Sequence, residues 1–154
     1  MKPSPILMLL AEDNQSDSEL ILASLSDYAG VIHVVHDGVQ TLDFVFRRGQ
    51  YANREEEACL RVIVLDVKLP RINGFEVLRE LKSDPRTRPI PVVMLTSSNI
   101  ESDVTRGYQL GANSYVQKPV DFERFRRTVR QLGLYWLTAN EAPVLPSRCF
   151  NPSE

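Results

Sequence analysis

The segment Val62-Ile63-Val64-Leu65-Asp66 decides the fold, because four consecutive apolar residues end directly in an aspartate. Near-continuous apolarity of this kind is typical of a strand that is buried on both faces of a sheet. Four more short runs rich in β-branched residues recur along the chain, the last being the weakest, at residues 6–11, 31–35, 92–95 and 114–116. The sequence therefore predicts five buried strands.

The segments between these runs have helical spacing. Apolar residues recur three or four positions apart in the second and third gaps, at Val39, Leu42 and Phe46 and at Phe75, Leu78 and Leu81. After the fifth run, Asp121 is placed to cap a helix whose apolar face comprises Phe122, Phe125, Val129 and Leu132. Regular alternation of strand and helix with short connections favours right-handed crossovers. We therefore expect an α/β fold, a doubly wound parallel sheet with helices on both faces.

The length of 154 residues, with 43% hydrophobic and 25% charged residues, is ordinary for one globular domain. We assign residues 1–137 to this domain. Within it, residues 50–59 include three consecutive glutamates and are predicted to form a surface insertion before the third strand. Residues 138–154 contain three prolines and little periodicity, so they are predicted to be an irregular C-terminal tail.

The composition argues against several functional classes. A formal net charge of −2 gives no general attraction to nucleic acid or to an anionic membrane. The apolar run at residues 6–11 is far too short to span a bilayer. Cys59 and Cys149 have no His or Cys partners at metal-binding spacing, so neither a zinc site nor a disulfide framework is indicated. We expect a cytoplasmic protein that binds neither nucleic acid nor membrane.

Polar residues stand at the ends of four predicted strands. They are Glu12-Asp13 after the first strand, Asp66 after the third, Thr96-Ser97 at the end of the fourth, and Lys118-Pro119 just beyond the fifth. In a doubly wound sheet, ligand sites form outside the carboxyl ends of the strands. We therefore expect these side chains to converge on one site.

The residue types at this site suit phosphoryl chemistry. Three clustered carboxylates repel one another unless a cation lies among them, and an all-oxygen set such as Glu12, Asp13 and Asp66 suits Mg²⁺. A carboxylate beside such an ion can attack phosphorus and form an acyl phosphate, and Asp66 is the best candidate for this nucleophile. Lys118 would supply an ammonium, and Thr96 a hydroxyl, to the phosphoryl oxygens.

The same residues stand in the order and spacing of a known family. Between about Pro5 and Leu132 the chain resembles response-regulator receivers, in Glu12-Asp13-Asn14, in Asp66 followed by Leu69-Pro70 and Gly74, in Thr96-Ser97-Ser98, and in Gly111-Ala112-Asn113-Ser114-Tyr115 leading to Lys118-Pro119. The resemblance implies a flavodoxin-like five-stranded sheet in the order 2-1-3-4-5, with Asp66 as the phosphoacceptor. It also implies an Mg²⁺ site formed by Glu12, Asp13, Asp66 and the backbone carbonyl of Lys68.

The resemblance further implies a single-domain response regulator of a two-component phosphorelay. Such a protein accepts a phosphoryl group from a histidine kinase and catalyses only its own phosphorylation and dephosphorylation, so it is not an enzyme acting on external substrates. Thr96 would then move toward the phosphoryl group, Tyr115 would turn inward, and the signal would leave through the fourth helix, fifth strand and fifth helix. Leu134-Tyr135-Trp136-Leu137 and the tail resemble stand-alone regulators paired with phytochromes, which implies a bacteriophytochrome as the candidate kinase and a homodimer.

Taken singly, several of these residues have simpler explanations. Glu12 and Asp13 could merely end a strand and cap the helix that begins near Gln15, and Asn14 or Ser16 could also form that cap. Thr96 is equally well explained as the last β-branched residue of a buried strand. Tyr115 could be a core aromatic residue with its hydroxyl at the surface.

Three other functions compete with the receiver. A phosphatase with an aspartyl nucleophile usually carries a second aspartate two residues later, where this chain has Lys68. A degenerate receiver that works as a binding module usually lacks an acidic residue or the lysine, and this chain keeps them all. DNA binding is not favoured, because the sequence shows neither an appended helix-turn-helix domain nor a basic net charge.

Overall fold

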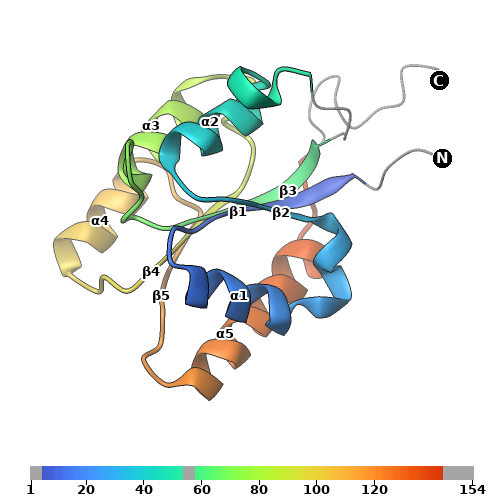
Figure 1. The fold of residues 1–154 in the computed structure, drawn as a ribbon. Helices are drawn as coiled ribbons and strands as arrows, with labels where there is room; N and C mark the ends of the chain where they lie inside the picture. Colours follow the sequence, from blue (N-terminus) through green and yellow to red (C-terminus); the bar gives the residue numbers. More distant parts are fainter. Residues whose placement is uncertain (1–4, 54–57, 144–154) are drawn as a thin grey trace.

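Five parallel strands form one sheet in the order β2-β1-β3-β4-β5, as the family resemblance implied (Figure 1). The computed structural model describes residues 5–53 and 58–143. The strands are β1 (Ile6–Ala11), β2 (Ile32–Val35), β3 (Ala58–Leu65), β4 (Val92–Thr96) and β5 (Ser114–Gln117). The predicted α/β class is therefore confirmed.

Helices cover both faces of this sheet. The helices α2 (Gly38–Phe46), α3 (Gly74–Ser83) and α4 (Glu101–Gln109) lie on one face, and α1 (Gln15–Ser24) and α5 (Phe122–Leu134) lie on the other (Figure 1). Short 3₁₀ segments at Ser26–Val31 and Gly49–Tyr51 follow α1 and α2. A π-helical turn, Tyr135–Ala139, continues directly from α5.

Side-chain caps explain where four of the helices begin. Asn14, Asp37, Asn73 and Asp121 each accept a hydrogen bond from a backbone N–H in the first turn of the helix that follows. Such a cap satisfies a donor that has no partner within the helix. The cap predicted at Asp121 is therefore present, and of the candidate caps of α1 it is Asn14 that accepts the hydrogen bond.

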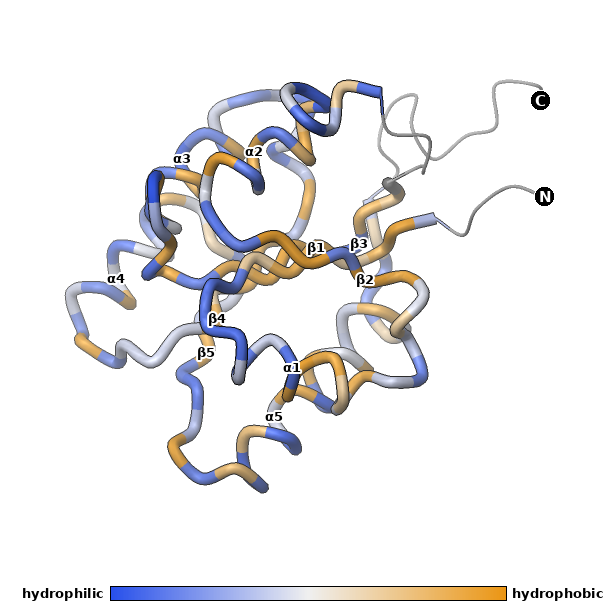
Figure 2. The backbone as a smooth tube through the Cα atoms, in the orientation of Figure 1, coloured by the Kyte–Doolittle hydropathy of each residue, from blue (hydrophilic) through white to orange (hydrophobic). Residues whose placement is uncertain are grey.

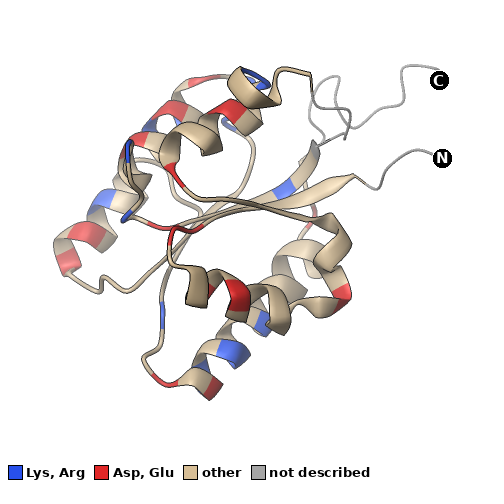
Figure 3. Ribbon diagram, viewed as in Figure 1, with Lys and Arg blue, Asp and Glu red and all other residues tan. Residues whose placement is uncertain are grey.

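Two apolar cores lie on the two faces of the sheet. One packs Leu9, Ile63 and Met94 under α2 and α3, and the other packs Met8, Val62 and Val93 under α1 and α5. Alternate residues of the same strands therefore serve opposite cores, which explains the near-continuous apolar runs. Figure 2 shows the apolar residues of the strands at the centre of the molecule, and Figure 3 shows most charged residues on the helices and loops around them.

Three details of the sequence prediction were wrong. Residues 58 and 59, assigned to a surface insertion, belong to β3, because Ala58 pairs with Ile6 of β1; residues 54–57 lie outside the described part of the chain. Residues 138 and 139, assigned to an irregular tail, continue the helical turn after α5; residues 144–154 lie outside the described part. Phe122, expected on the apolar face of α5, is 60% exposed because it is the first residue of the helix and borders an open pocket beside α1.

Across residues 5–53 and 58–143, no helix is both long enough and apolar enough to cross a membrane.

Candidate functional site

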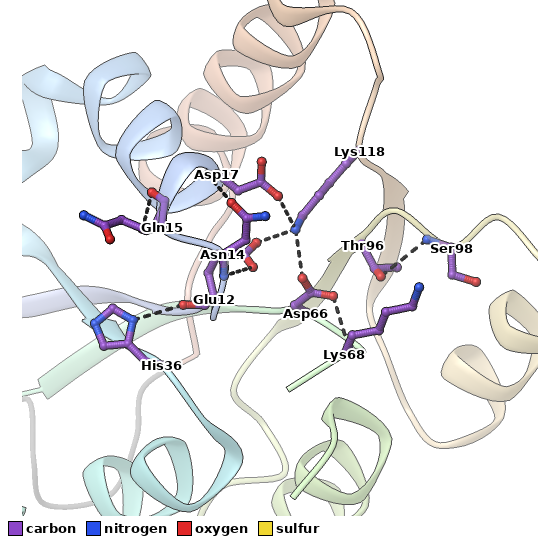
Figure 4. Close-up of polar contacts among 11 residues, drawn as sticks. Glu12, Asn14, Gln15, Asp17, His36, Asp66, Lys68, Thr96, Ser98 and Lys118 are labelled. Carbon is purple, nitrogen blue, oxygen red and sulfur yellow. Dashed lines mark hydrogen bonds and ion pairs between the residues drawn. The ribbon is translucent and has the colours of Figure 1, made fainter. Parts of the chain in front are cut away.

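Asp66 lies at the carboxyl end of the central strand β3, at the edge of the sheet where the predicted site residues meet (Figure 4). Its backbone N–H donates a hydrogen bond to Ala11 O over 3.1 Å, which fixes it beside the end of β1. Its side chain is buried, since only 7% of the residue is exposed. The backbone of Gly74 packs so closely against Asp66 that a Cβ atom at Gly74 would lie 2.1 Å from Asp66 O.

Lys118 joins the acidic residues of this site into one cluster (Figure 4). Its Nζ lies 2.8 Å from Asp66 Oδ2, 2.5 Å from Glu12 Oε1 and 2.8 Å from Asp17 Oδ2. Its backbone N–H donates to Thr96 O over 2.7 Å, which ties the segment after β5 to the end of β4. An ammonium has three N–H donors, so Lys118 uses all of them on carboxylates.

The charges of the cluster set its protonation. Burial raises the pKa of Glu12 to about 7. Burial favours the neutral form of Asp66, but the hydrogen bond and charge of Lys118, together with the hydrogen bonds from the Lys68 backbone and Glu12, outweigh burial and hold the pKa of Asp66 below its ordinary value. Burial opposes the charge of Lys118, but its hydrogen bonds to the three carboxylates raise the pKa of Lys118 above its ordinary value. Asp66 and Lys118 are therefore an ionised pair at neutral pH.

The predicted metal ligands are brought to one edge of the sheet but do not yet surround a common point. Glu12 is buried and Asp13 is exposed, and Glu12 Oε2 accepts the N–H of Asn14 over 3.2 Å. Among the described residues, no three His, Cys, Asp or Glu side chains are arranged as a metal centre. The reason is that Glu12 and Asp66 both turn toward the ammonium of Lys118.

The chemistry of this donor set nevertheless fits a divalent cation. The three carboxylates around Lys118 carry two more negative charges than that ammonium neutralises when all of them are ionised. Carboxylate and backbone carbonyl oxygens are the ligands that hard divalent ions prefer. The backbone N–H of Lys68 donates to Asp66 Oδ1 over 3.1 Å, which places the peptide that follows Val67 beside the acidic cluster (Figure 4).

Thr96 and Tyr115 lie on neighbouring strands, and both are hydrogen-bonded to Ser98. Thr96 is fully buried, and its Oγ1 lies 3.5 Å from the backbone N of Ser98. The hydroxyl of Tyr115 donates to Ser98 O over 3.0 Å, and burial raises the pKa of Tyr115. The side chain of Ser98 in turn donates to Asp103 Oδ2 of α4 over 2.7 Å. The two predicted switch residues are therefore linked through the loop between β4 and α4.

Sequence analysis missed Asp17 and Ser98. Asp17 lies in the first turn of α1, and its backbone N–H donates to Asn14 Oδ1 over 3.0 Å. An acidic residue in a first helical turn is common because it interacts favourably with the helix dipole, so its sequence context gave no sign of a contact with Lys118. Ser98 was quoted as part of a motif, but its role in holding Tyr115 depends on a contact between residues 17 positions apart.

The fold and the site define a receiver, and comparison with known proteins agrees. The model of the response regulator receiver domain matches residues 8–130, so the chain belongs to this family and is a phosphoacceptor protein of two-component signalling. Membership implies a kinase as its partner. Among curated relatives, the probable methanogenesis regulatory protein FilR2 of Methanothrix harundinacea is 38% identical over 90% of this chain and 88% of its own. Response regulator Rcp1 of Synechocystis is 34% identical over 93% of this chain and 95% of its own.

Solved structures give the same result. The phosphorylated cyanobacterial phytochrome response regulator RcpA has a TM-score of 0.83 and 32% identity, covering 92% of this chain and 100% of its own. The bacteriophytochrome response regulator RtBRR has a TM-score of 0.68 and 44% identity, covering 94% and 87%.

Two further structures contain a metal. The first is the Mn²⁺-bound form of Rcp1, with a TM-score of 0.82 and 32% identity, covering 91% of this chain and 100% of its own. The second is the receiver domain of the sensor histidine kinase PA1611 of Pseudomonas aeruginosa, with magnesium in its active-site cleft; it has a TM-score of 0.61 and 26% identity, covering 83% of this chain and 97% of its own. Receiver domains therefore bind a divalent ion.

Proposed function

We propose that Asp66 is the phosphoacceptor of a single-domain response regulator. The observation that carries this proposal is the ion pair between the buried Asp66 carboxylate and Lys118, at 2.8 Å, at the carboxyl end of the central strand. The hydrogen bond and charge of Lys118, with the Lys68 N–H and Glu12, together keep the buried Asp66 ionised, as a nucleophile must be. Burial instead raises the pKa of Glu12, the other carboxylate of the cluster that follows a strand.

In the proposed reaction, a carboxylate oxygen of Asp66 attacks the phosphorus of a phosphohistidine on the partner kinase. The new O–P bond forms as the P–N bond breaks, and the imidazole leaves with the electron pair of that bond and takes up a proton. Lys118 balances negative charge on the transferred group through its ammonium. The hydroxyl of Thr96 is the neutral donor for another phosphoryl oxygen.

We assign the divalent ion of this receiver as Mg²⁺, held by Glu12, Asp13, Asp66 and the backbone carbonyl of Lys68. When bound, Mg²⁺ neutralises phosphoryl oxygens and orients the phosphodonor. The excess negative charge around Lys118 supports this assignment. Because Glu12 and Asp66 now pair with Lys118, both side chains must rotate partly away from the ammonium as they become ligands.

We propose that the signal leaves through the face formed by α4, β5 and α5, with Thr96 and Tyr115 as switch residues. The chain of hydrogen bonds from Thr96 through Ser98 to Tyr115 supports this route. Movement of Thr96 toward a phosphoryl group would pull on the backbone of Ser98, to which the Tyr115 hydroxyl is bound.

The proposed partner is a histidine kinase of the bacteriophytochrome type, since RcpA and RtBRR are response regulators of phytochromes. We further propose a cytoplasmic homodimer. The exposed apolar side chains of Leu134 and Tyr135, each 51% exposed at the end of α5, support self-association. Sedimentation would report a dimer for the wild type and a monomer for Leu134→Glu if this end of α5 forms the interface.

The test of the phosphoacceptor is intact mass after incubation with Mg²⁺ and acetyl phosphate. We expect the wild type to gain one phosphoryl group, about 80 Da, only when Mg²⁺ is present, and Asp66→Asn to gain none. Glu80→Gln is the control, because Glu80 is an exposed acidic residue of α3 outside the cluster. Phosphorylation of Asp66→Asn to the wild-type level would refute the assignment.

A further inference from the structure

The ammonium of Lys118 has a third carboxylate partner, Asp17, that the proposed reaction does not use. Asp17 comes from α1, whereas Glu12 and Asp66 follow strands of the sheet, so three separate elements meet at this one cation. Its side chain is 29% exposed, compared with 3% for Glu12 and 9% for Asp66. Figure 4 shows Asp17 on the opposite side of the Lys118 ammonium from Asp66.

The other two partners of Lys118 have a second task. The proposed function assigns Glu12 and Asp66 to the divalent ion, and a carboxylate that binds a cation attracts an ammonium less strongly. Asp66 also loses its negative charge on the oxygen that forms the acyl phosphate. During the reaction Lys118 therefore loses part of its attraction to two of its three partners, and Asp17 alone keeps its full charge.

Lys118 needs such an anchor because of the nature of its side chain. A lysine has four rotatable side-chain bonds, and holding its ammonium in one place costs side-chain entropy. The backbone of Lys118 is fixed by the hydrogen bond to Thr96 O, but that bond does not orient the ammonium. Asp17 can orient it because its carboxylate is joined by only two rotatable side-chain bonds to a backbone that is fixed at the start of α1 by the hydrogen bond from Asp17 N–H to Asn14 Oδ1.

Asp17 also lies on the accessible side of the cluster. An open pocket of about 350 Å³ is lined by residues of α1, the end of β4 and the segment after β5, among them Asp17, Ser97 and Lys118. Asp17 and Lys118 both line this pocket, whereas Asp66 does not. The Asp17–Lys118 contact is therefore accessible from solvent through this pocket.

We propose that Asp17 is a positioning residue that holds the ammonium of Lys118 in place for phosphoryl transfer to Asp66. This inference rests on the proposed function for its reaction, but the contact on which it depends exists in the metal-free, unphosphorylated protein. Asp17 acts only through Lys118. It touches neither the phosphoryl group nor the metal.

The first experiment observes the Lys118 ammonium directly, by ¹⁵N-detected NMR of lysine side chains in the metal-free protein. The chain has only four lysines, at positions 2, 68, 82 and 118, so the signals are readily assigned with Lys118→Arg. Lysine ammonium groups held by carboxylates exchange slowly with water. We expect the Lys118 signal to broaden in Asp17→Ala, because one N–H group of the ammonium loses its acceptor and exchanges faster with water while Glu12 and Asp66 remain. The signal should keep its wild-type width in Glu19→Ala, which removes an exposed acidic residue of the same helix. Lys82, whose ammonium is held by three oxygens elsewhere, is the internal reference.

The second experiment measures the rate of phosphorylation by acetyl phosphate in a double-mutant cycle. We expect Asp17→Ala to slow the reaction by about tenfold to a hundredfold, the range for a misplaced reacting group, and Glu19→Ala to leave it unchanged. In a Lys118→Ala background, Asp17→Ala should have no further effect. A merely structural role would slow both backgrounds equally.

An unchanged Lys118 signal in Asp17→Ala, or equal slowing in the two backgrounds, overturns the proposal. A wild-type protein that accepts no phosphoryl group contradicts the proposed function instead, and leaves Asp17 no reaction to assist. The ammonium signal separates these two failures, because it is recorded without metal or phosphodonor.

Discussion

Gly74 is the position where a single methyl group should most disturb the site. A Cβ atom there would lie 2.1 Å from Asp66 O, 2.8 Å from Val67 Cα and 2.9 Å from Asp66 C, and real Cβ atoms essentially never approach other heavy atoms closer than 3.0 Å. All three contacts are with backbone, so no change of rotamer relieves them. Gly74→Ala must therefore displace either the start of α3 or the segment that carries Asp66.

The cost follows from what resists that displacement. The start of α3 is bound by the hydrogen bond from Gly74 N to Val67 O, 2.8 Å, and α3 buries Phe75, Leu78 and Leu81 in the core. Overpacking of this kind costs about 1–3 kcal/mol, and a backbone clash belongs at the upper end. Alanine favours a helix over glycine by about 1 kcal/mol, so a net loss of stability in Gly74→Ala would show that the clash costs more than this gain. We expect a loss of about 2 kcal/mol, which lowers Tm by roughly 4–8 °C in a chain of this size.

Urea unfolding followed by circular dichroism measures this loss. Gly30→Ala is the matched control, because a Cβ atom at Gly30 meets nothing within 4 Å, and its effect should stay within about 0.5 kcal/mol. Gly74→Ala should also slow phosphorylation by acetyl phosphate, since it moves the backbone of Asp66. If both variants unfold at the wild-type urea midpoint, the close approach of Gly74 to Asp66 carries no energetic weight and the reasoning is wrong.

Other perturbations test separate parts of the molecule. Burial lowers the pKa of Lys82 from 10.5 to about 8, so between these pH values the unfolded chain binds a proton that the folded chain has lost. The free energy of unfolding of the wild type should therefore rise with pH from about 8 to 10.5 relative to that of Lys82→Met. Parallel pH profiles of the two proteins would contradict this. Asp121→Ala removes the cap of α5 and should cost about 1 kcal/mol in urea unfolding, whereas Asp121→Asn, which keeps the acceptor, should cost much less. Lys68→Ala should change the lifetime of the acyl phosphate, because the N–H of Lys68 donates to Asp66 and its charged side chain therefore starts next to the phosphoacceptor. If the phosphorylated variant, followed by intact mass, loses its phosphoryl group at the wild-type rate, Lys68 has no effect on this lifetime.

The sequence by itself determined the elements of this fold and the residue types of its site. Buried strands in a parallel sheet need apolar side chains on both faces, so they appear in the sequence as short continuous apolar segments such as residues 62–65. The cap at Asp121 is also readable, because the residue and the N–H that it accepts lie three positions apart. The motif residues Asp66, Thr96 and Lys118 were located from their positions at strand ends, since all parallel strands present their carboxyl ends to one edge of the sheet.

Only the tertiary structure decided which of these residues touch. Lys118 meets Asp17 and Asp66 across 101 and 52 residues of sequence, and no periodicity encodes contacts over such distances. The sequence prediction missed the start of β3 for the same reason: Ala58 belongs to the strand only because it pairs with Ile6 of β1. The position of Phe122 depended on where the pocket beside α1 opens, although its spacing matched the buried face of α5. Sequence patterns report local periodicity, whereas ion pairs, strand ends and exposure depend on segments that only folding brings together.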